Sequence, residues 1–293
     1  MKNQKKKIFE GVATAIVTPF KRDRVDYCAF EKLIERQIDG GVDALVFCGT
    51  TGEAPTLTEL EKKNILSFAK ETVGGRVPVI FGSGTNSYKS TMSLSEHAAK
   101  EGADALLCVT PYYNKGTREG ILRTYRDVCS LGVPVILYNI PSRSGVDVTL
   151  DMLRTLSEEE NLCAVKECAG TLRICDICNY LGESYSVYSG NDGELLPSLA
   201  VGASGIISVL SNLYPEKVKR VYSLFKEGKC DESRREFFLL SGMSRLLFEE
   251  TNPAPIKYAL STLSLCENSL RLPLMKIDEP LCRKIDLEMQ RIG

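Results

Sequence analysis

Eight short apolar runs alternate with longer segments of helical composition, and this alternation limits the possible folds more than any other feature of the 293-residue chain. Each of the seven gaps between the runs can hold a helix. Continuous apolar runs of this length are typical of strands that are buried on both faces of a parallel sheet. The runs cover residues 11–18, 43–49, 77–84, 104–110, 133–139, 162–167, 185–190 and 204–209.

The segments between the runs carry helix signals of their own. Residues 30–40 have apolar side chains at helical spacing, and residues 58–75 begin with Thr58, a good N-cap, and end on glycine. A further helical segment, residues 215–228, follows the eighth run. Strands that alternate with helices form right-handed crossovers in a parallel sheet.

Eight such repeats predict an α/β fold of the TIM-barrel type, a closed (β/α)8 barrel over residues 1–228. Residues 229–293 contain further helical stretches and are predicted to be a C-terminal helical extension of the same domain. A doubly wound open sheet is the alternative. No G-x-G-x-x-G follows the first run, and "GSGTNS" at 82–87 lacks the acidic partner and the later glycine of that motif.

The net charge of −1 argues against a general nucleic-acid-binding protein, since no basic stripe appears beyond the lysine-rich residues 2–7. That lysine run precedes no apolar segment, so it does not predict a signal peptide. No apolar stretch approaches the ~18 residues that a membrane span needs. We therefore expect a cytoplasmic protein with no nucleic-acid or membrane partner.

The eleven cysteines are an odd and high number. Several lie inside the apolar runs and are interpreted as reduced core residues rather than a disulfide framework. Cys175 and Cys178 form one C-x-x-C without a second pair or suitably placed histidines, so structural thiols are expected there, with a redox or metal role as the alternative. Whether Cys168, two residues from Lys166, is sensitive to oxidation stays open.

The single histidine, His97, lies in a stretch of helical composition and is interpreted as a surface or packing residue. Serine–histidine, cysteine–histidine and histidine-rich metal chemistry would all depend on it. If the chain is an enzyme, its protons are therefore moved by tyrosine, lysine, threonine or carboxylate groups. No metal site is predicted.

Lys166 ends the sixth apolar run, although lysine is almost never fully buried. Taken alone, it would be an ordinary exposed charge. In a barrel, however, active sites lie at the C-terminal ends of the strands, where this lysine would meet the polar segments "GTTGE" (49–53), "TPYYN" (110–114) and "YNIPSRSG" (138–145). Glu167 would point to the opposite side of the strand and is interpreted as structural.

A desolvated lysine at this position has a lowered pKa, and its neutral amine can attack a carbonyl group. The resulting iminium makes the neighbouring C–H acidic enough for a tyrosinate to remove its proton. This chemistry requires no metal and no organic cofactor.

Five ordered motifs, "GTTGE", "TPYYN", "YNIPSRSG", "AVKECAG" and "NPAPIKYAL" (252–260), together resemble the pyruvate-dependent class I aldolases, the superfamily of dihydrodipicolinate synthase and N-acetylneuraminate lyase. The match extends over nearly the whole chain. Two details are similar to the synthase branch. Thr50 and Thr51 stand where the sialate lyases usually carry Ser-Thr, and Arg143 stands where sugar-acid aldolases generally lack an arginine.

The resemblance implies condensation of pyruvate with L-aspartate 4-semialdehyde to give 4-hydroxy-tetrahydrodipicolinate, a lyase step of diaminopimelate and lysine biosynthesis. The first alternative is another aldolase of the superfamily that cleaves a sialic acid or a 2-keto-3-deoxy sugar acid. The second, of a different class, is a non-catalytic barrel that serves as a binding or scaffold protein.

The resemblance also implies roles for single residues. Lys166 would form the Schiff base with pyruvate, and Tyr138 would be the proton donor and acceptor at the reacting carbon. Thr50 and Tyr113 would complete a proton relay, with Tyr113 reaching into the neighbouring subunit's site. The resemblance thus implies at least a dimer, and commonly a homotetramer built as a dimer of dimers.

Three further residues would bind the substrates. Thr51 would hold the pyruvate carboxylate through its hydroxyl and backbone N–H, and the backbone carbonyl of Ile207 would lie against pyruvate. Arg143 would bind the carboxylate of aspartate semialdehyde, because a guanidinium can grip a carboxylate bidentately.

The chain departs from the lysine-inhibited synthases, which bind lysine at a dimer interface with a histidine and a glutamate. It has Glu59 and Lys62 in the helix where the histidine would lie, and Ser90 where the glutamate would fall. The ammonium group of an inhibitor would lose its carboxylate partner. We therefore expect feedback inhibition by lysine to be weak or absent.

Overall fold

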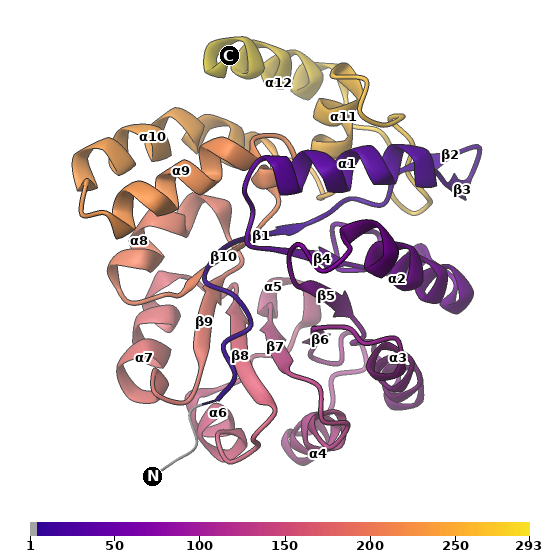
Figure 1. The fold of residues 1–293 in the computed structure, drawn as a ribbon, viewed down its shortest axis with the longest axis vertical. Coiled ribbons are helices and arrows are strands. Elements are labelled where there is room, and N and C mark those ends of the chain that lie inside the picture. The colour runs from indigo at the N-terminus through magenta and orange to yellow at the C-terminus, as the bar shows by residue number, and fades with distance from the viewer. Residues whose placement is uncertain (1–4) are drawn as a thin grey trace.

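Eight parallel strands close into a barrel in the computed structural model, which describes residues 5–293 (Figure 1). They neighbour one another in the order β1-β10-β9-β8-β7-β6-β5-β4, and β4 pairs with β1. This confirms the predicted TIM barrel, and every strand lies inside a predicted run. The strands are β1 (Gly11–Ala15), β4 (Ala44–Phe47), β5 (Val79–Gly82), β6 (Ala105–Val109), β7 (Val135–Asn139), β8 (Leu162–Glu167), β9 (Ser186–Ser189) and β10 (Gly205–Ser208).

Helices surround the strands (Figure 1). The predicted start of α2 is confirmed, because Thr58 forms a capping box with Glu61 and Gly74 ends the helix in the left-handed conformation at φ 57°. The surrounding helices are α1 (Tyr27–Asp39), α2 (Glu59–Val73), α3 (Tyr88–Lys100), α4 (Arg118–Cys129), α6 (Leu150–Leu156), α7 (Thr171–Leu181), α8 (Leu195–Ala200) and α9 (Pro215–Lys226).

Several short elements were not predicted. They are the antiparallel pair β2 (Phe20–Lys21) and β3 (Arg24–Val25), the helix α5 (Pro141–Ser144), and the 3₁₀ turns η1 (Ala54–Thr56), η2 (Asp192–Glu194) and η3 (Leu210–Asn212). All are too short to produce a periodic pattern in the sequence. Four of them, α5 and the three 3₁₀ turns, follow barrel strands and shape the mouth of the barrel.

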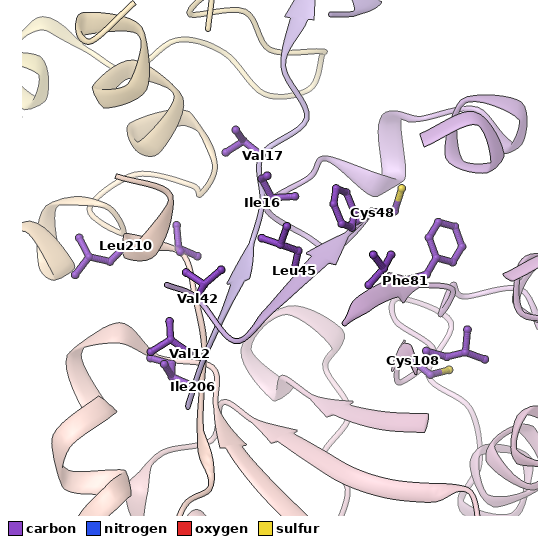
Figure 2. Close-up of a cluster of buried hydrophobic side chains, with 14 of the residues drawn as sticks. Val12, Ile16, Val17, Val42, Leu45, Cys48, Phe81, Cys108, Ile206 and Leu210 are labelled. Carbon is purple, nitrogen blue, oxygen red and sulfur yellow. The ribbon is translucent and has the colours of Figure 1, made fainter. Parts of the chain in front are cut away.

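The strands separate two apolar layers, because successive side chains point to opposite faces of a strand. Val135 and Leu137 of β7 belong to the large cluster between the strands and the helices, whereas Ile136 and Tyr138 belong to the smaller cluster inside the barrel. Figure 2 shows part of the outer layer, in which Val12 of β1 lies beside its register partner, Ile206 of β10. This alternation determines which strand-end side chains face the interior.

The predicted C-terminal helices are confirmed as α10 (Cys230–Leu246), α11 (Ala254–Thr262) and α12 (Glu279–Ile292). Helix α10 packs along α9 and against α12, and α11 contacts η3 at the barrel mouth. In α11, the Lys257 ammonium pairs with the carboxylate of Glu53, which follows Thr50 and Thr51; both charged side chains are fully buried.

Within residues 5–293, no helix combines the length and the apolar composition that a membrane crossing requires. The N-terminal lysine run lies partly in residues 1–4, outside the described part of the chain.

Candidate active site

Lys166 lies inside the barrel, where the alternation of β8 places it. The strand is buried along its whole length, and the lysine side chain is only 6% exposed. Its register partner on β7 is Tyr138, and the Lys166 Nζ lies 4.3 Å from the centre of the tyrosine ring. Glu167 points outward as expected and accepts hydrogen bonds from the Asn139 side chain and the backbone N–H of Ala169.

Burial lowers the pKa of Lys166, because the barrel interior disfavours the ammonium form. The charge of Arg143 acts in the same direction, while Cys168 and Asp192 oppose it. Desolvation dominates, so the folded chain holds a larger fraction of the amine in its neutral, nucleophilic form than free lysine would have.

Tyr138 is equally enclosed, at 5% exposure, and burial raises its pKa well above the ordinary value. Thr50 and the Arg143 charge act to lower its pKa, and Cys168 acts to raise it. Tyr138 thus has the lysine at its ring and Thr50 beside it in the cavity lining. This arrangement suits a group that passes a proton between a bound molecule and Thr50.

A cavity of ≈ 780 Å³, including space open to solvent, lies at the C-terminal ends of β4 to β7 and reaches Tyr138 and Thr50. Its lining includes three predicted site residues, Thr50, Tyr138 and Arg143, together with Tyr112 and Lys62. Much of the remaining lining is apolar or glycine. A small polar ligand would therefore contact a few polar groups in a cavity whose surface is otherwise mostly apolar.

Thr51 and Arg143 are linked through Asn252, a residue that the sequence reasoning missed. The Asn252 Nδ2 donates to the Thr51 Oγ1 at 3.0 Å, and the Arg143 Nη2 donates to the Asn252 backbone oxygen at 3.3 Å. The Asn252 Oδ1 is buried and has no partner within residues 5–293, which costs about 1–3 kcal/mol. "NPAPIKYAL" marked this segment in the sequence, but only the three-dimensional structure shows its contacts.

Asp192 was also missed by the sequence reasoning, since residues 189–192, "SGND", have the composition of an ordinary turn. Its carboxylate accepts hydrogen bonds from the backbone N–H groups of Val209 and Leu210, both at 3.0 Å, and from the Ser208 hydroxyl. Burial raises its pKa, and its charge interacts with Lys166. The carboxylate thereby ties the end of β9 to the end of β10 beneath the lysine.

Gly190, in the same turn, is required by the close approach of the lysine side chain. A Cβ atom at this position would lie 2.2 Å from the Cys168 Sγ and 2.8 Å from the Lys166 Cε. Only a residue without a side chain leaves room for both groups.

The sequence profile of the Dihydrodipicolinate synthetase family matches residues 8–290. The chain belongs to this family. A 4-hydroxy-tetrahydrodipicolinate synthase of Alkaliphilus oremlandii is 40% identical over 286 residues, 97% of this chain and 99% of the relative. The crystal structure of dihydrodipicolinate synthase from Aquifex aeolicus has a TM-score of 0.94 and 41% identity and covers 97% of this chain and 98% of its own.

A second solved family member is the chloride-inhibited dihydrodipicolinate synthase of Acinetobacter baumannii, complexed with pyruvate. It is 33% identical, with a TM-score of 0.94, and the match covers 98% of this chain and 99% of the other. The family resemblance inferred from the five motifs is thereby confirmed.

Four predicted site residues do not line the cavity: Lys166, Thr51, Ile207 and Tyr113. Ile207, on β10, is fully buried in the inner cluster together with Tyr138. Tyr113 is 88% exposed, with a left-handed backbone at φ 70°, and does not line the cavity. Within residues 5–293, no group of three or more histidine, cysteine, aspartate or glutamate side chains is arranged to hold a metal ion.

Proposed function

We propose that this barrel mouth condenses pyruvate with L-aspartate 4-semialdehyde to give 4-hydroxy-tetrahydrodipicolinate. The activity is that of a 4-hydroxy-tetrahydrodipicolinate synthase, a lyase of diaminopimelate and lysine biosynthesis, as in full-length relatives at 40% identity. The observation that carries the proposal is the buried Lys166 amine against the ring of Tyr138.

In the first half of the reaction, the neutral Lys166 amine attacks the keto carbon of pyruvate. Loss of water gives the iminium, while the Thr51 hydroxyl and backbone N–H hold the carboxylate. Tyr138 then takes a proton from the methyl group and leaves the enamine, which is nucleophilic at that carbon. Thr50, which lines the cavity together with Tyr138, gives the proton a path away from the tyrosine.

In the second half, Arg143 binds the carboxylate of aspartate semialdehyde, and the enamine carbon attacks the aldehyde. The relay returns a proton to the new alkoxide, which becomes the 4-hydroxyl group. The substrate amine then attacks the iminium carbon, so that the Lys166 amine leaves and the ring closes. The Ile207 carbonyl is proposed to lie against pyruvate throughout.

Borohydride reduction in the presence of pyruvate tests whether Lys166 forms the Schiff base on which this proposal depends. The Lys166 peptide should gain the mass of a reduced pyruvate adduct. Lys257 is the internal control, because it is also buried but is paired with Glu53. An unmodified Lys166 peptide, or equal labelling of Lys257, would refute the Schiff-base mechanism.

Arg143→Ala tests the choice of the second substrate. Loss of hydrogen bonds to a charged group should raise KM for aspartate semialdehyde by about tenfold to a hundredfold, whereas pyruvate labelling of Lys166 continues. A coupled reductase assay measures KM for aspartate semialdehyde. An unchanged KM would favour a sugar-acid aldolase, for which cleavage of N-acetylneuraminate is the direct assay.

We also propose a homotetramer, a dimer of dimers in which Tyr113 completes the relay in a neighbouring subunit. Its exposure in the single chain, next to the cavity-lining Tyr112, supports this arrangement. Mixing Tyr113→Phe subunits with Lys166→Met subunits should restore activity that neither homo-oligomer has. If mixing restores nothing, the shared site is wrong.

Two further proposals concern the chain as a whole. Residues 229–293 are proposed to belong to the same domain as the barrel at 1–228, supported by the packing of α10 along α9 and by the Lys257–Glu53 pair. A cytoplasmic location is supported by the eleven cysteines, all of which are free.

A further inference from the structure

Asn252 contacts both predicted carboxylate-binding side chains. It lies outside the barrel repeats, two residues before α11, and is 4% exposed. Its side-chain N–H reaches the Thr51 hydroxyl, and its backbone carbonyl reaches the Arg143 guanidinium. Thr51 follows β4 and Arg143 lies in α5, so two separate barrel loops meet at one residue of the C-terminal segment.

The segment that carries Asn252 is itself fixed to the β4 loop. Lys257, five residues further on, pairs with Glu53 and donates to the backbone oxygen of Ser269 at 2.8 Å. The second oxygen of Glu53 accepts from the backbone N–H of Arg271 at 3.1 Å. These buried contacts leave Asn252 little freedom to move relative to Thr51.

We propose that Asn252 is a positioning residue that fixes the spacing and the donor directions of the two carboxylate-binding groups. The inference rests on the proposed function, because it assumes that Thr51 holds the pyruvate carboxylate and Arg143 that of aspartate semialdehyde. Asn252 acts through both residues rather than on the reacting atoms.

The direction of the first hydrogen bond carries the argument. A threonine hydroxyl has one proton to donate, and here its oxygen accepts from the Asn252 amide. The Thr51 O–H is therefore free to donate to a carboxylate. An aspartate at position 252 would reverse this bond, since an ionised carboxylate can only accept and would take the Thr51 proton for itself.

The second contact has a similar effect on Arg143. One N–H of the guanidinium is engaged by the Asn252 carbonyl, which leaves its remaining donors for a bidentate grip on a substrate. A negative charge at position 252 would compete with the substrate for this guanidinium. Asn252→Asp should thus weaken the binding of both substrates, although the side chain differs from that of the parent only by an oxygen in place of the amide nitrogen.

The experiment compares the full-length parent with Asn252→Ala and Asn252→Asp. In steady-state assays with both substrates, we expect Asn252→Asp to raise KM for pyruvate and for aspartate semialdehyde by about tenfold or more each. Asn252→Ala keeps the backbone carbonyl, so it should raise KM for pyruvate by a smaller factor and leave that for aspartate semialdehyde near the parent value.

Asn161→Asp is the matched control. Asn161 donates to the backbone oxygen of Cys129 at 3.0 Å, just before β8 and thus at the opposite end of the barrel. Both KM values should stay at the parent level in this variant. Thermal unfolding of all variants separates a loss of fold from a loss of binding.

A purely structural Asn252 would give a different pattern. Both variants would then lower the unfolding temperature and the amount of active enzyme, while both KM values would stay unchanged, and the proposal would be overturned. Borohydride trapping of pyruvate on the parent is run alongside. Failure of trapping in the parent refutes the proposed function itself, whereas trapping with unchanged KM values in Asn252→Asp refutes only the positioning role.

Discussion

At the scale of single residues, two buried lysines show how the same side chain serves opposite purposes. Burial lowers the pKa of both Lys166 and Lys257. Lys257 is compensated by a direct ion pair with Glu53 and by one further hydrogen bond, to the backbone oxygen of Ser269. Lys166 has no ion pair with a carboxylate within residues 5–293, and its main contact is the ring of Tyr138. Glu53 therefore favours the charged form of Lys257, whereas no carboxylate of the described residues pairs with Lys166 to oppose the loss of its proton in this way.

The lowered pKa of Lys166 predicts a pH-dependent cost to stability. Between the folded-state pKa and the ordinary value of 10.5, the unfolded chain binds more protons than the folded chain. The free energy of unfolding therefore rises with pH through this window, and the cost is fully present below it. Lys166→Met should raise the unfolding temperature at neutral pH, and this gain should vanish above the window. A gain that is independent of pH would contradict the prediction.

Gly190→Ala should inactivate the enzyme without unfolding it. The new Cβ would overlap the Lys166 Cε and the Cys168 Sγ, and a displacement of about 1 Å at the amine can cost about a hundredfold in kcat. Gly193→Ala is the control, since a Cβ there would meet nothing within 4 Å. Equal activity of the two variants in the coupled assay would show that the lysine does not depend on this space.

Cys168 should react slowly with thiol reagents in spite of its place in the site. Burial raises its pKa to about 11, so little thiolate exists at neutral pH. We expect iodoacetamide at pH 7.5 to label the exposed Cys28 and Cys230 long before Cys168, as peptide mass mapping would measure. Rapid loss of activity together with labelling of Cys168 would instead identify an oxidation-sensitive site.

At the scale of elements, α2 carries two of the residues on which the expected weak inhibition by lysine depends. Lys62 lines the cavity and has no ion-pair partner within residues 5–293, whereas Glu59 is engaged by Lys63 at 2.7 Å and by Ser93. The unpaired charge that α2 presents to the cavity is thus a cation, which repels the ammonium group of an inhibitor.

Lysine should consequently inhibit the enzyme weakly or not at all. A dose–response assay at saturating pyruvate measures this directly. We expect Lys62→Glu to be more sensitive to lysine than the parent, because it replaces a cation at the cavity with a carboxylate. Inhibition of the parent at sub-millimolar lysine would contradict the prediction.

The sequence was sufficient to predict the long elements but not the short ones around the site. Strands such as β4 and β8 are buried on both faces, so their apolar runs are recognisable, and α2 has a complete set of cap signals. The turn η2, in contrast, carries contacts with distant residues, such as that of Asp192 with Ser208 of β10. No periodicity in the sequence reports such contacts.

At the scale of the whole molecule, the Lys257–Glu53 pair joins the C-terminal helices to the barrel. Lys257→Met would leave Glu53 buried and unpaired, which should cost about 3–5 kcal/mol of unfolding free energy. The double variant Lys257→Met/Glu53→Gln removes the stranded charge and should recover part of the loss. Urea unfolding measures both, and equal stability of the single and double variants would contradict this account.

The candidate site was predictable only as far as strand order determines it. Lys166, Tyr138, Thr50 and Arg143 follow from the rule that parallel strands end on one side of the barrel, and the structure places them together around Tyr138. Asn252 could not be found in this way, because it lies 201 residues from Thr51 in the sequence. Such a contact depends on how the C-terminal segment packs.

The late position of Asn252 and Lys257 in the chain has a consequence for synthesis. A ribosome releases all eight strands before it releases the residues that hold Thr51 and Glu53, since these contacts join positions 201 and 204 residues apart. A nascent or prematurely ended chain can therefore contain every barrel strand and still lack the groups that order its mouth. The aldehyde and keto acid substrates would therefore find an ordered site only after the segment with Asn252 and Lys257 has been synthesised and has packed against the barrel.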